Sequence, residues 1–176
     1  FVCGDLGPTT KAISVTGGVT FEELAAHYRI QALGLMAGGA DYLLLETCQD
    51  TRNVKAGLIG IERAFEECGW RLPVAVSVTI EPTGTMLAGQ DAEALAVSLG
   101  HADLLYVGVN CATGPALMAD HLRTFSELCR TRVACVPNAV LGFRMVKPAV
   151  AAAARPTNSR RPTLVSFDSS MCSSRC

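Results

Sequence analysis

Polar residues that can take part in chemistry lie at the ends of four separate apolar runs of this chain. The run 104–110 ends in Asn110 and is followed by Cys111, a potential thiolate ligand or nucleophile. Three other runs end in or lead into Gly7-Pro8-Thr9, Glu46-Thr47 and Pro137-Asn138-Ala139. Barrel enzymes built from parallel strands carry their catalytic groups at the carboxyl ends of those strands. The arrangement therefore predicts the core of an enzyme.

Strand and helix patterns alternate along the chain between these segments. A helix begins at Thr20, where Glu23 completes a capping box, and it ends at Gly38-Gly39. Near-continuous apolar strands with helices between them are typical of a buried parallel sheet. The other predicted helices are 51–68, 91–99 and 115–129, and the predicted strands are 2–5, 41–46, 73–80, 104–110 and 133–136.

Two architectures have this alternating pattern, a doubly wound sheet and part of an eight-stranded barrel. A dinucleotide-binding sheet carries G-x-G-x-x-G after a strand, and a phosphate-binding loop carries G-x-x-x-x-G-K-[ST]. Neither motif occurs in the chain. Their absence favours an α/β fold that is a partial (β/α)8 barrel, which we expect over residues 1–140.

The pattern changes after this region. Residues 141–176 are interrupted by prolines, are rich in arginine and serine, and lack apolar periodicity, which predicts a divergent, disordered tail. The chain also opens inside a strand pattern, at Phe1-Val2-Cys3, without an initiator methionine. We therefore expect a truncated fragment that lacks the first strands and the last strand of the barrel.

The composition argues against several classes of partner. Hydrophobic residues make up 49% of the chain, and its net charge of −1 offers no attraction for nucleic acid. The chain has no apolar run long enough to span a membrane and no signal-peptide pattern. The eight cysteines permit a disulfide framework, but most of them sit within regular elements. Reduced thiols and a cytoplasmic location are expected instead.

In order and spacing, five segments resemble the homocysteine-binding domain of cobalamin-dependent methionine synthases, within the homocysteine S-methyltransferase family. The similarity extends from Phe1 to about Ala139. It implies a (β/α)8 barrel with one zinc at the carboxyl ends of its strands, where three cysteine thiolates hold the metal and homocysteine adds its sulfur. The segments are GDLGPTTKAIS, FEELAAHYRIQALGLMAGGADYLLLETCQDTRNVKAG, TIEPTGTMLAGQ, VGVNCATGP and VPNA.

The same resemblance implies the reaction and its partners. The zinc-bound sulfur of homocysteine is methylated from methylcobalamin to give methionine, and separate modules of the parent enzyme bind cobalamin and folate. Soft sulfur ligands suit zinc, and a metal lowers the pKa of a bound thiol. Two alternatives stay open. One is a homocysteine methyltransferase that uses betaine or S-methylmethionine, and the other is a truncated remnant without catalytic activity.

Matching the family residue by residue implies a role for several side chains. Cys111 matches a zinc cysteine, Asn138 matches an asparagine that can occupy the metal without substrate, and Glu46 matches a carboxylate that holds the substrate's amino group. Without the resemblance, Cys111 reads as a small buried residue and Asn138 as a turn residue that bonds its own backbone. The segment Gly7, Pro8 and Thr9 shapes the substrate site or is a simple turn. Asn110 is also placed in the substrate site.

The chain departs from the family at the metal. The other two zinc cysteines of the family are adjacent and follow two glycines, and no such sequence occurs here. Cys172 and Cys176 lie in the unpatterned tail and are not assigned to the metal. We therefore expect zinc to bind weakly or not at all, and the chain alone to be inactive. A shifted reading frame near Val140 would explain the loss of similarity.

Overall fold

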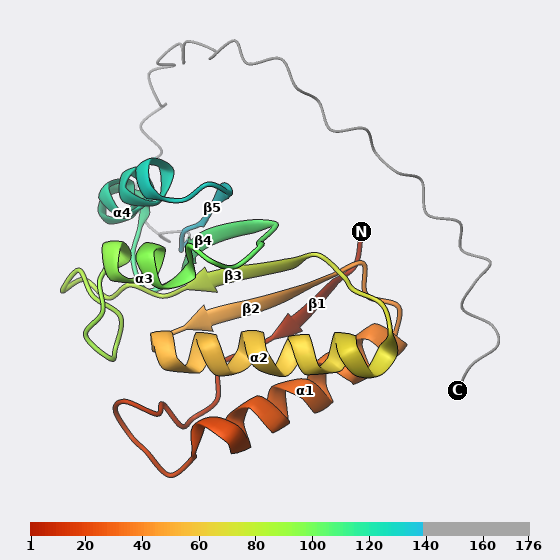
Figure 1. Cartoon of the computed structure of the whole chain (residues 1–176). Helices are drawn as coiled ribbons and strands as arrows, with labels where there is room; N and C mark the ends of the chain where they lie inside the picture. The colour runs from red at the N-terminus through yellow and green to blue at the C-terminus, as the bar shows by residue number, and fades with distance from the viewer. Residues whose placement is uncertain (139–176) are drawn as a thin grey trace. The chain divides into compact units, whose positions relative to one another are not determined.

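Residues 1–138 are described in the computed structural model of this chain (Figure 1). The tail predicted for residues 141–176, with Cys172 and Cys176, lies outside the described residues. Five parallel strands form one sheet in the order β1-β2-β3-β4-β5, and each strand therefore pairs with the next one along the chain. The strands are β1 (Cys3–Leu6), β2 (Tyr42–Cys48), β3 (Val74–Val78), β4 (Tyr106–Asn110) and β5 (Arg132–Val136).

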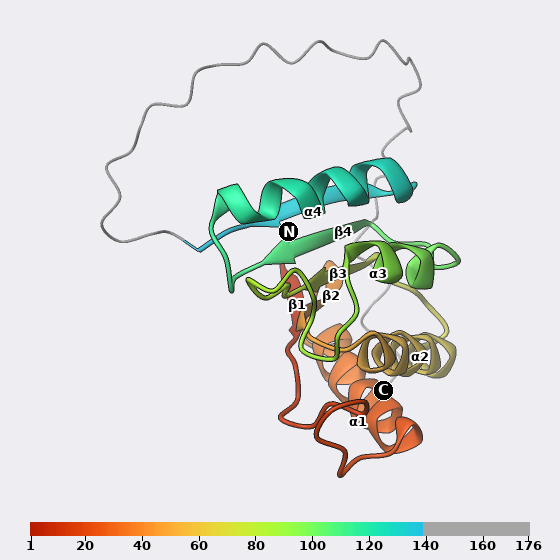
Figure 2. The same cartoon turned by 90° about the vertical axis from the view of Figure 1, so that its left-hand side faces the viewer.

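Four helices connect these strands and cover one side of the sheet (Figures 1 and 2). Crossovers between neighbouring parallel strands have one hand, so a sheet that never reverses its order keeps its helices on one side. A doubly wound sheet reverses direction at a switch point. The observed order excludes that alternative for the described residues. The helices are α1 (Phe21–Ala37), α2 (Thr51–Cys68), α3 (Ala92–Leu99) and α4 (Pro115–Leu128).

The helix ends lie where the capping residues predict them. The Thr20 hydroxyl accepts a hydrogen bond from the Glu23 amide at 3.2 Å, and the Glu23 carboxylate accepts one from the Thr20 amide at 2.8 Å. Asp50 and Asp91 cap α2 and α3 without a reciprocal bond, since their carboxylates accept from the amides of Arg52 and Ala94. Gly69 ends α2 with a φ of 75°, a left-handed conformation that glycine adopts without strain. These contacts confirm the predicted capping box and the predicted end of the second helix.

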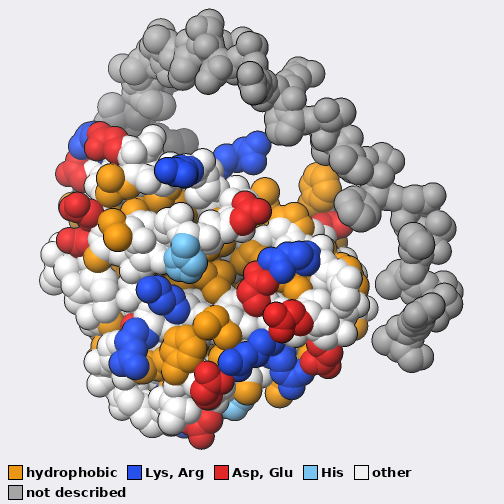
Figure 3. Space-filling view, in the orientation of Figure 1, with side chains coloured by type: hydrophobic (Ala, Val, Ile, Leu, Met, Phe, Trp, Pro, Cys, Tyr) orange, Lys and Arg blue, Asp and Glu red, His pale blue; other side chains and the backbone are white. Residues whose placement is uncertain are grey.

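Helices α1 and α2 pack closely because Gly60 leaves room at their contact. A Cβ atom at Gly60 would lie 2.5 Å from the carbonyl oxygen of Ala25 and 2.8 Å from Cβ of Tyr28. On the outer surface the pair is joined by Arg63–Glu22 and Arg29–Glu67 ion pairs. Figure 3 shows basic and acidic side chains interspersed on this face. Exposed pairs of this kind add little stability, so the close backbone contact determines the packing.

Two further features concern the described residues as a whole. None of the described helices combines the length and the hydropathy that crossing a membrane requires. Within residues 1–138 all six cysteines are unpaired, as the reduced-thiol prediction requires.

Burial raises the pKa of the Cys48 thiol to about 12, with a smaller contribution from the Asp5 and Glu46 carboxylates. Cys48 therefore stays protonated at neutral pH and serves packing.

The Gly60 contact gives a direct test of this packing. We expect Gly60→Ala to lower the free energy of unfolding by about 1–3 kcal/mol, because the added methyl group meets backbone atoms that cannot move away. Gly34→Ala is the matched control, since Gly34 lies within α1 and a Cβ there meets nothing within 4 Å. The control should gain about 0.5–1 kcal/mol from helix propensity. Urea denaturation measures both changes, and equal effects of the two variants would contradict the close approach.

Candidate functional site

The carboxyl end of β2 carries a β-bulge at Glu46 and Thr47. The pairing with β3 shifts between Leu45 and Cys48, where two residues of β2 occupy the space of one. Thr47 has a φ of 55°, in the left-handed region that a β-branched residue rarely adopts. Bulges next to active sites re-aim side chains. Here the bulge sets the directions of the two residues that the sequence placed at this strand end.

Asn110, at the end of β4, joins three strands through its side-chain amide. Its Oδ1 accepts a hydrogen bond from the Ser77 hydroxyl on β3 at 2.7 Å. Its Nδ2 donates to the Thr47 hydroxyl on β2 at 2.7 Å. The residue is 6% exposed, so both contacts are protected from water. The structure therefore gives Asn110 a role in fixing the geometry of the strand ends.

Cys111 follows directly, and its sulfur lies within this network. Thr79 Oγ1 is 3.1 Å from Cys111 Sγ, and Asn110 Nδ2 is 3.5 Å from it. The Cys111 amide donates to the carbonyl of Val136 at 3.1 Å, which fastens the residue to the end of β5. Cys111 and Ala112 have φ values of 41° and 54°. Non-glycine residues in this region cost about 1–3 kcal/mol each and are concentrated at functional sites.

Asn138 lies beside the same loop. Its backbone amide donates to the carbonyl of Thr113, two residues after Cys111, at 3.4 Å. The side chain of Asn138 is exposed. Thr113 is 5% exposed, and its hydroxyl has no hydrogen-bond partner among the described residues. The ends of β2, β3, β4 and β5 thus bring the loops that carry Glu46, Cys111 and Asn138 to one edge of the sheet.

Glu46 is half-buried and faces another carboxylate. Burial raises its pKa above the ordinary value of 4.5, and Asp5 on β1 raises it further by charge repulsion and a hydrogen bond between the two side chains. The register pairs Asp5 with Leu44, two residues before Glu46 and on the same face of the sheet. Within residues 1–138, no basic side chain forms an ion pair with Glu46. An added cationic group would stabilise its charged form.

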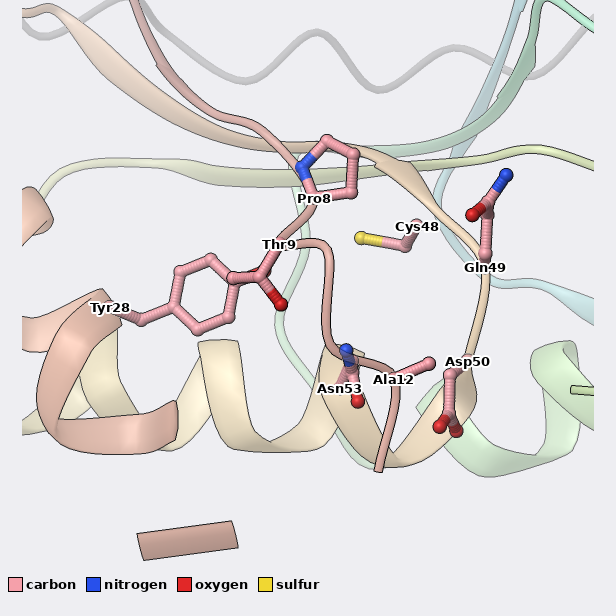
Figure 4. Close-up of a pocket in the computed structure, with 8 residues that line it drawn as sticks. All are labelled: Pro8, Thr9, Ala12, Tyr28, Cys48, Gln49, Asp50 and Asn53. Carbon is pink, nitrogen blue, oxygen red and sulfur yellow. The ribbon is translucent and has the colours of Figure 1, made fainter. Parts of the chain in front are cut away.

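The segment Gly7, Pro8 and Thr9 follows β1 and turns toward helix α1. The Tyr28 hydroxyl donates to the Gly7 carbonyl at 3.4 Å, and the Thr9 hydroxyl donates to the Lys11 carbonyl at 2.7 Å. Pro8 and Thr9 line a pocket of about 10 Å³ with Cys48 and Asp50 (Figure 4). That volume holds one water molecule at most. The geometry supports a turn beside the site as readily as a surface that contacts substrate.

Asp50 also lines this pocket but is fully engaged within the protein. It is buried, and its carboxylate accepts from the amides of Ser14 at 2.8 Å and Arg52 at 2.9 Å. It caps α2 and fastens the segment before α1 to the sheet edge. These contacts give Asp50 a structural role as a helix cap.

The described residues do not complete a zinc site. Tetrahedral zinc takes four ligands, and structural or catalytic sites supply at least three from the protein. Among residues 1–138, no three histidine, cysteine, aspartate or glutamate side chains come close enough to share a metal. The residues that the family resemblance assigns to the metal in this part of the chain are Cys111 and Asn138. They would offer one sulfur and one amide oxygen, half of the four ligands that tetrahedral zinc takes.

Sequence reasoning gave no role to three hydroxyl side chains of this site: Thr47, which it named at a strand end, and Ser77 and Thr79, which it missed. A signal for two of them is present, since Ser77 and Thr79 are polar residues two positions apart in an otherwise apolar strand. Alternating positions on a strand share a face. Two hydroxyls on one face of a buried strand need partners, and these partners lie on the next strand in Asn110 and Cys111.

The raised pKa of Glu46 predicts a pH-dependent change in stability. A carboxyl group with a raised pKa destabilises the folded state where it is ionised, and this cost disappears as the pH falls below the unfolded value of 4.5. Glu46→Gln should therefore unfold at higher urea concentration than the wild type at neutral pH. The difference should shrink as the pH is lowered through the folded-state pKa toward 4.5. The exposed Glu127→Gln is the control, and a gain independent of pH would contradict this explanation.

Comparisons with known proteins support the family. The family model described as homocysteine S-methyltransferase matches residues 1–159. The methionine synthases of Mycobacterium leprae (strain TN) and Mycobacterium tuberculosis (strain ATCC 25618 / H37Rv) are 42% and 41% identical to this chain over 141 residues. In both cases the match covers 80% of this chain and 12% of the relative, so the chain spans about an eighth of the relatives' length.

The fold is similar to crystal structures of the homocysteine methyltransferase MmuM from Escherichia coli. The apo form gives a TM-score of 0.63 at 20% identity and covers 78% of this chain and 49% of that chain. The metallated form gives a TM-score of 0.61 at 19% identity, with coverages of 77% and 48%. At these identities the likeness concerns the fold, while the family model and the methionine synthases concern the sequence. This chain belongs to the homocysteine S-methyltransferase family.

Proposed function

We propose that the described residues form the homocysteine-binding edge of a methyltransferase barrel. The observation that carries the proposal is the network that fixes the bulge after Glu46, the amide of Asn110 and the sulfur of Cys111 at the carboxyl edge of one sheet. Such an edge is where barrel enzymes place their substrates. The sequential strand order is that of a (β/α)8 barrel of which residues 1–140 form one part.

The amino acid end of the substrate is assigned to Glu46. Its carboxylate has no cationic partner within residues 1–138 and is destabilised by its surroundings. An ammonium group bound there forms a charge-assisted hydrogen bond and relieves the repulsion from Asp5. The side chain therefore gains more from an incoming amine than a solvated carboxylate would. The Gly7–Thr9 turn lies beside it at the end of the neighbouring strand.

The sulfur end of the substrate is assigned to the neighbourhood of Cys111. In the proposed site Cys111 is one of three thiolates on zinc, and Asn138 is a ligand only in the absence of substrate. Bound zinc would lower the pKa of the substrate thiol while leaving its sulfur nucleophilic. The remaining thiolates must come from outside the described residues. We therefore propose that zinc affinity is weak in this chain and that the chain alone does not turn over.

Methylcobalamin is the proposed methyl donor, bound by another module of a longer protein. The two methionine synthases are 42% and 41% identical to this chain, whereas the homocysteine methyltransferase MmuM is 20% identical to it. This difference favours cobalamin over betaine or S-methylmethionine. Folate would bind a further module. Unpaired thiols and a soft metal ligand fit the reducing cytoplasm, which is the compartment we propose.

Titration calorimetry of the full chain with L-homocysteine, at saturating zinc, tests both ends of the proposed site. Glu46→Gln should weaken homocysteine binding about 10- to 100-fold, because a charge-assisted hydrogen bond is lost, and should leave zinc affinity unchanged. Cys111→Ser should abolish the weak zinc binding. Cys68→Ser is the control, since Cys68 is exposed at the end of α2.

Several outcomes would contradict the proposed function. Absence of homocysteine binding at saturating zinc, or equal binding by wild type and Glu46→Gln, would overturn the substrate assignment. Zinc binding that is unaffected in Cys111→Ser would overturn the metal assignment. Tight, stoichiometric zinc binding that depends on Cys111 would show that the chain holds a complete metal site.

A further inference from the structure

We propose that Thr79 is a positioning residue for Cys111: its hydroxyl, together with the amide of Asn110, holds the sulfur in one orientation at the carboxyl edge of the sheet. The proposal rests on the proposed role of Cys111 as a thiolate ligand. Thr79 lies just beyond the end of β3, and Cys111 just beyond the end of β4. The two side chains therefore meet across neighbouring strands.

The contact is short and its hydroxyl partner is rigidly held. The distance from Thr79 Oγ1 to Cys111 Sγ is 3.1 Å. Thr79 is 2% exposed, and its backbone amide donates to the carbonyl of Cys48 at 3.0 Å. The hydroxyl cannot turn to water, so Cys111 and the Asn110 carbonyl at 3.5 Å are its available partners. A buried hydroxyl without a hydrogen-bond partner costs free energy, so the Thr79 hydroxyl stays in contact with the Cys111 sulfur.

The hydrogen atoms can be arranged consistently for either form of the sulfur. A thiol donates to Thr79 Oγ1, and the Thr79 hydroxyl then donates to the Asn110 carbonyl. A ligating thiolate only accepts, so it takes one hydrogen bond from Thr79 and one from Asn110 Nδ2. Both arrangements leave the sulfur in the same place. A change of Cys111 from thiol to thiolate therefore requires only that the Thr79 hydroxyl hydrogen turn from the Asn110 carbonyl to the sulfur.

The backbone at Cys111 explains why a side-chain restraint is needed. Cys111 and the next residue, Ala112, are both left-handed, with φ values of 41° and 54°. The Cys111 amide donates a hydrogen bond to the Val136 carbonyl, the Cys111 carbonyl accepts one from the Thr113 amide, and the two contacts to the sulfur hold the side chain. Without the Thr79 hydroxyl, the sulfur would keep the longer contact to the side-chain amide of Asn110. That amide is already hydrogen-bonded to Thr47 and Ser77. The Thr79 hydroxyl is thus the nearer partner of the sulfur, and its other contact among the described residues is the Asn110 carbonyl.

Raman spectroscopy of the S–H stretch tests the contact on the full chain without any metal. The Cys111 band is assigned by subtracting the spectrum of Cys111→Ser. We expect this band at lower wavenumber than that of the exposed Cys68 thiol, and we expect Thr79→Val to shift it upward. Thr79→Ser keeps the hydroxyl and should restore the wild-type position. Thr83→Val is the control, because Thr83 is exposed and bonds only Thr85.

Cadmium supplies a second readout, through the charge-transfer absorption of its sulfur ligand. Loss of a partner that orients a ligand typically weakens metal binding about 10- to 100-fold, so we expect that loss in Thr79→Val and near-wild-type affinity in Thr79→Ser. An unshifted Raman band in Thr79→Val, with circular dichroism like the wild type, overturns the positioning role. A shifted band without any cadmium binding by the wild type confirms the positioning of the sulfur and contradicts the proposed ligand role of Cys111.

Discussion

The hydrogen bonds of one buried side-chain amide, that of Asn110, determine how the site is arranged. Asn110 is buried, and a buried amide that lacks partners costs about twice what a satisfied one contributes. Its hydrogen bonds reach Ser77 on the adjacent strand and Thr47 on the strand beyond it. Two strand spacings separate β2 from β4, so the amide can be satisfied on both sides only when all three strand ends hold their register. The geometry of the edge follows from that requirement.

The same requirement accounts for the unusual backbone at this edge. Thr47 and Cys111 are both left-handed without being glycine, which destabilises the fold locally. The Thr47 hydroxyl accepts a hydrogen bond from the side-chain amide of Asn110, and the Cys111 sulfur lies within hydrogen-bond distance of the Thr79 hydroxyl. Each strained residue is therefore held by a side-chain contact at the site. Strain that is fixed in this way gives a rigid edge, and rigidity is what an orienting site needs.

Local sequence signals predicted the scaffold well because each of them has a local physical cause. The Thr20–Glu23 capping box, the Asp50 cap and Gly69 set helix ends through contacts within a few residues, and the structure has the ends there. The apolar runs placed Glu46 and Cys111 at strand ends, where the structure has them, and the resemblance supplied the roles proposed for them.

The remaining features depend on contacts between segments distant in sequence. The bulge at Thr47 is fastened by a hydrogen bond from Asn110, which lies far along the chain. Composition and spacing carry no trace of that pairing. Likewise, α1 and α2 approach closely because Gly60 packs against the backbone of Ala25. The pattern of apolar residues within each helix does not specify that contact. The directions of Ser77 and Thr79 were readable from period-two alternation, but their partners required the strand order.

The two ends of the proposed substrate site differ in completeness, and this difference has a physical consequence. The carboxylate of Glu46 lies in surroundings that favour an incoming cation and needs no group beyond the described residues. At the proposed sulfur end the described residues offer one thiolate and one amide, while a zinc ion needs four ligands. In this proposal, recognition of an amine does not require activation of a thiol. Binding would depend on one sheet edge, and the chemistry would depend on ligands outside the described residues.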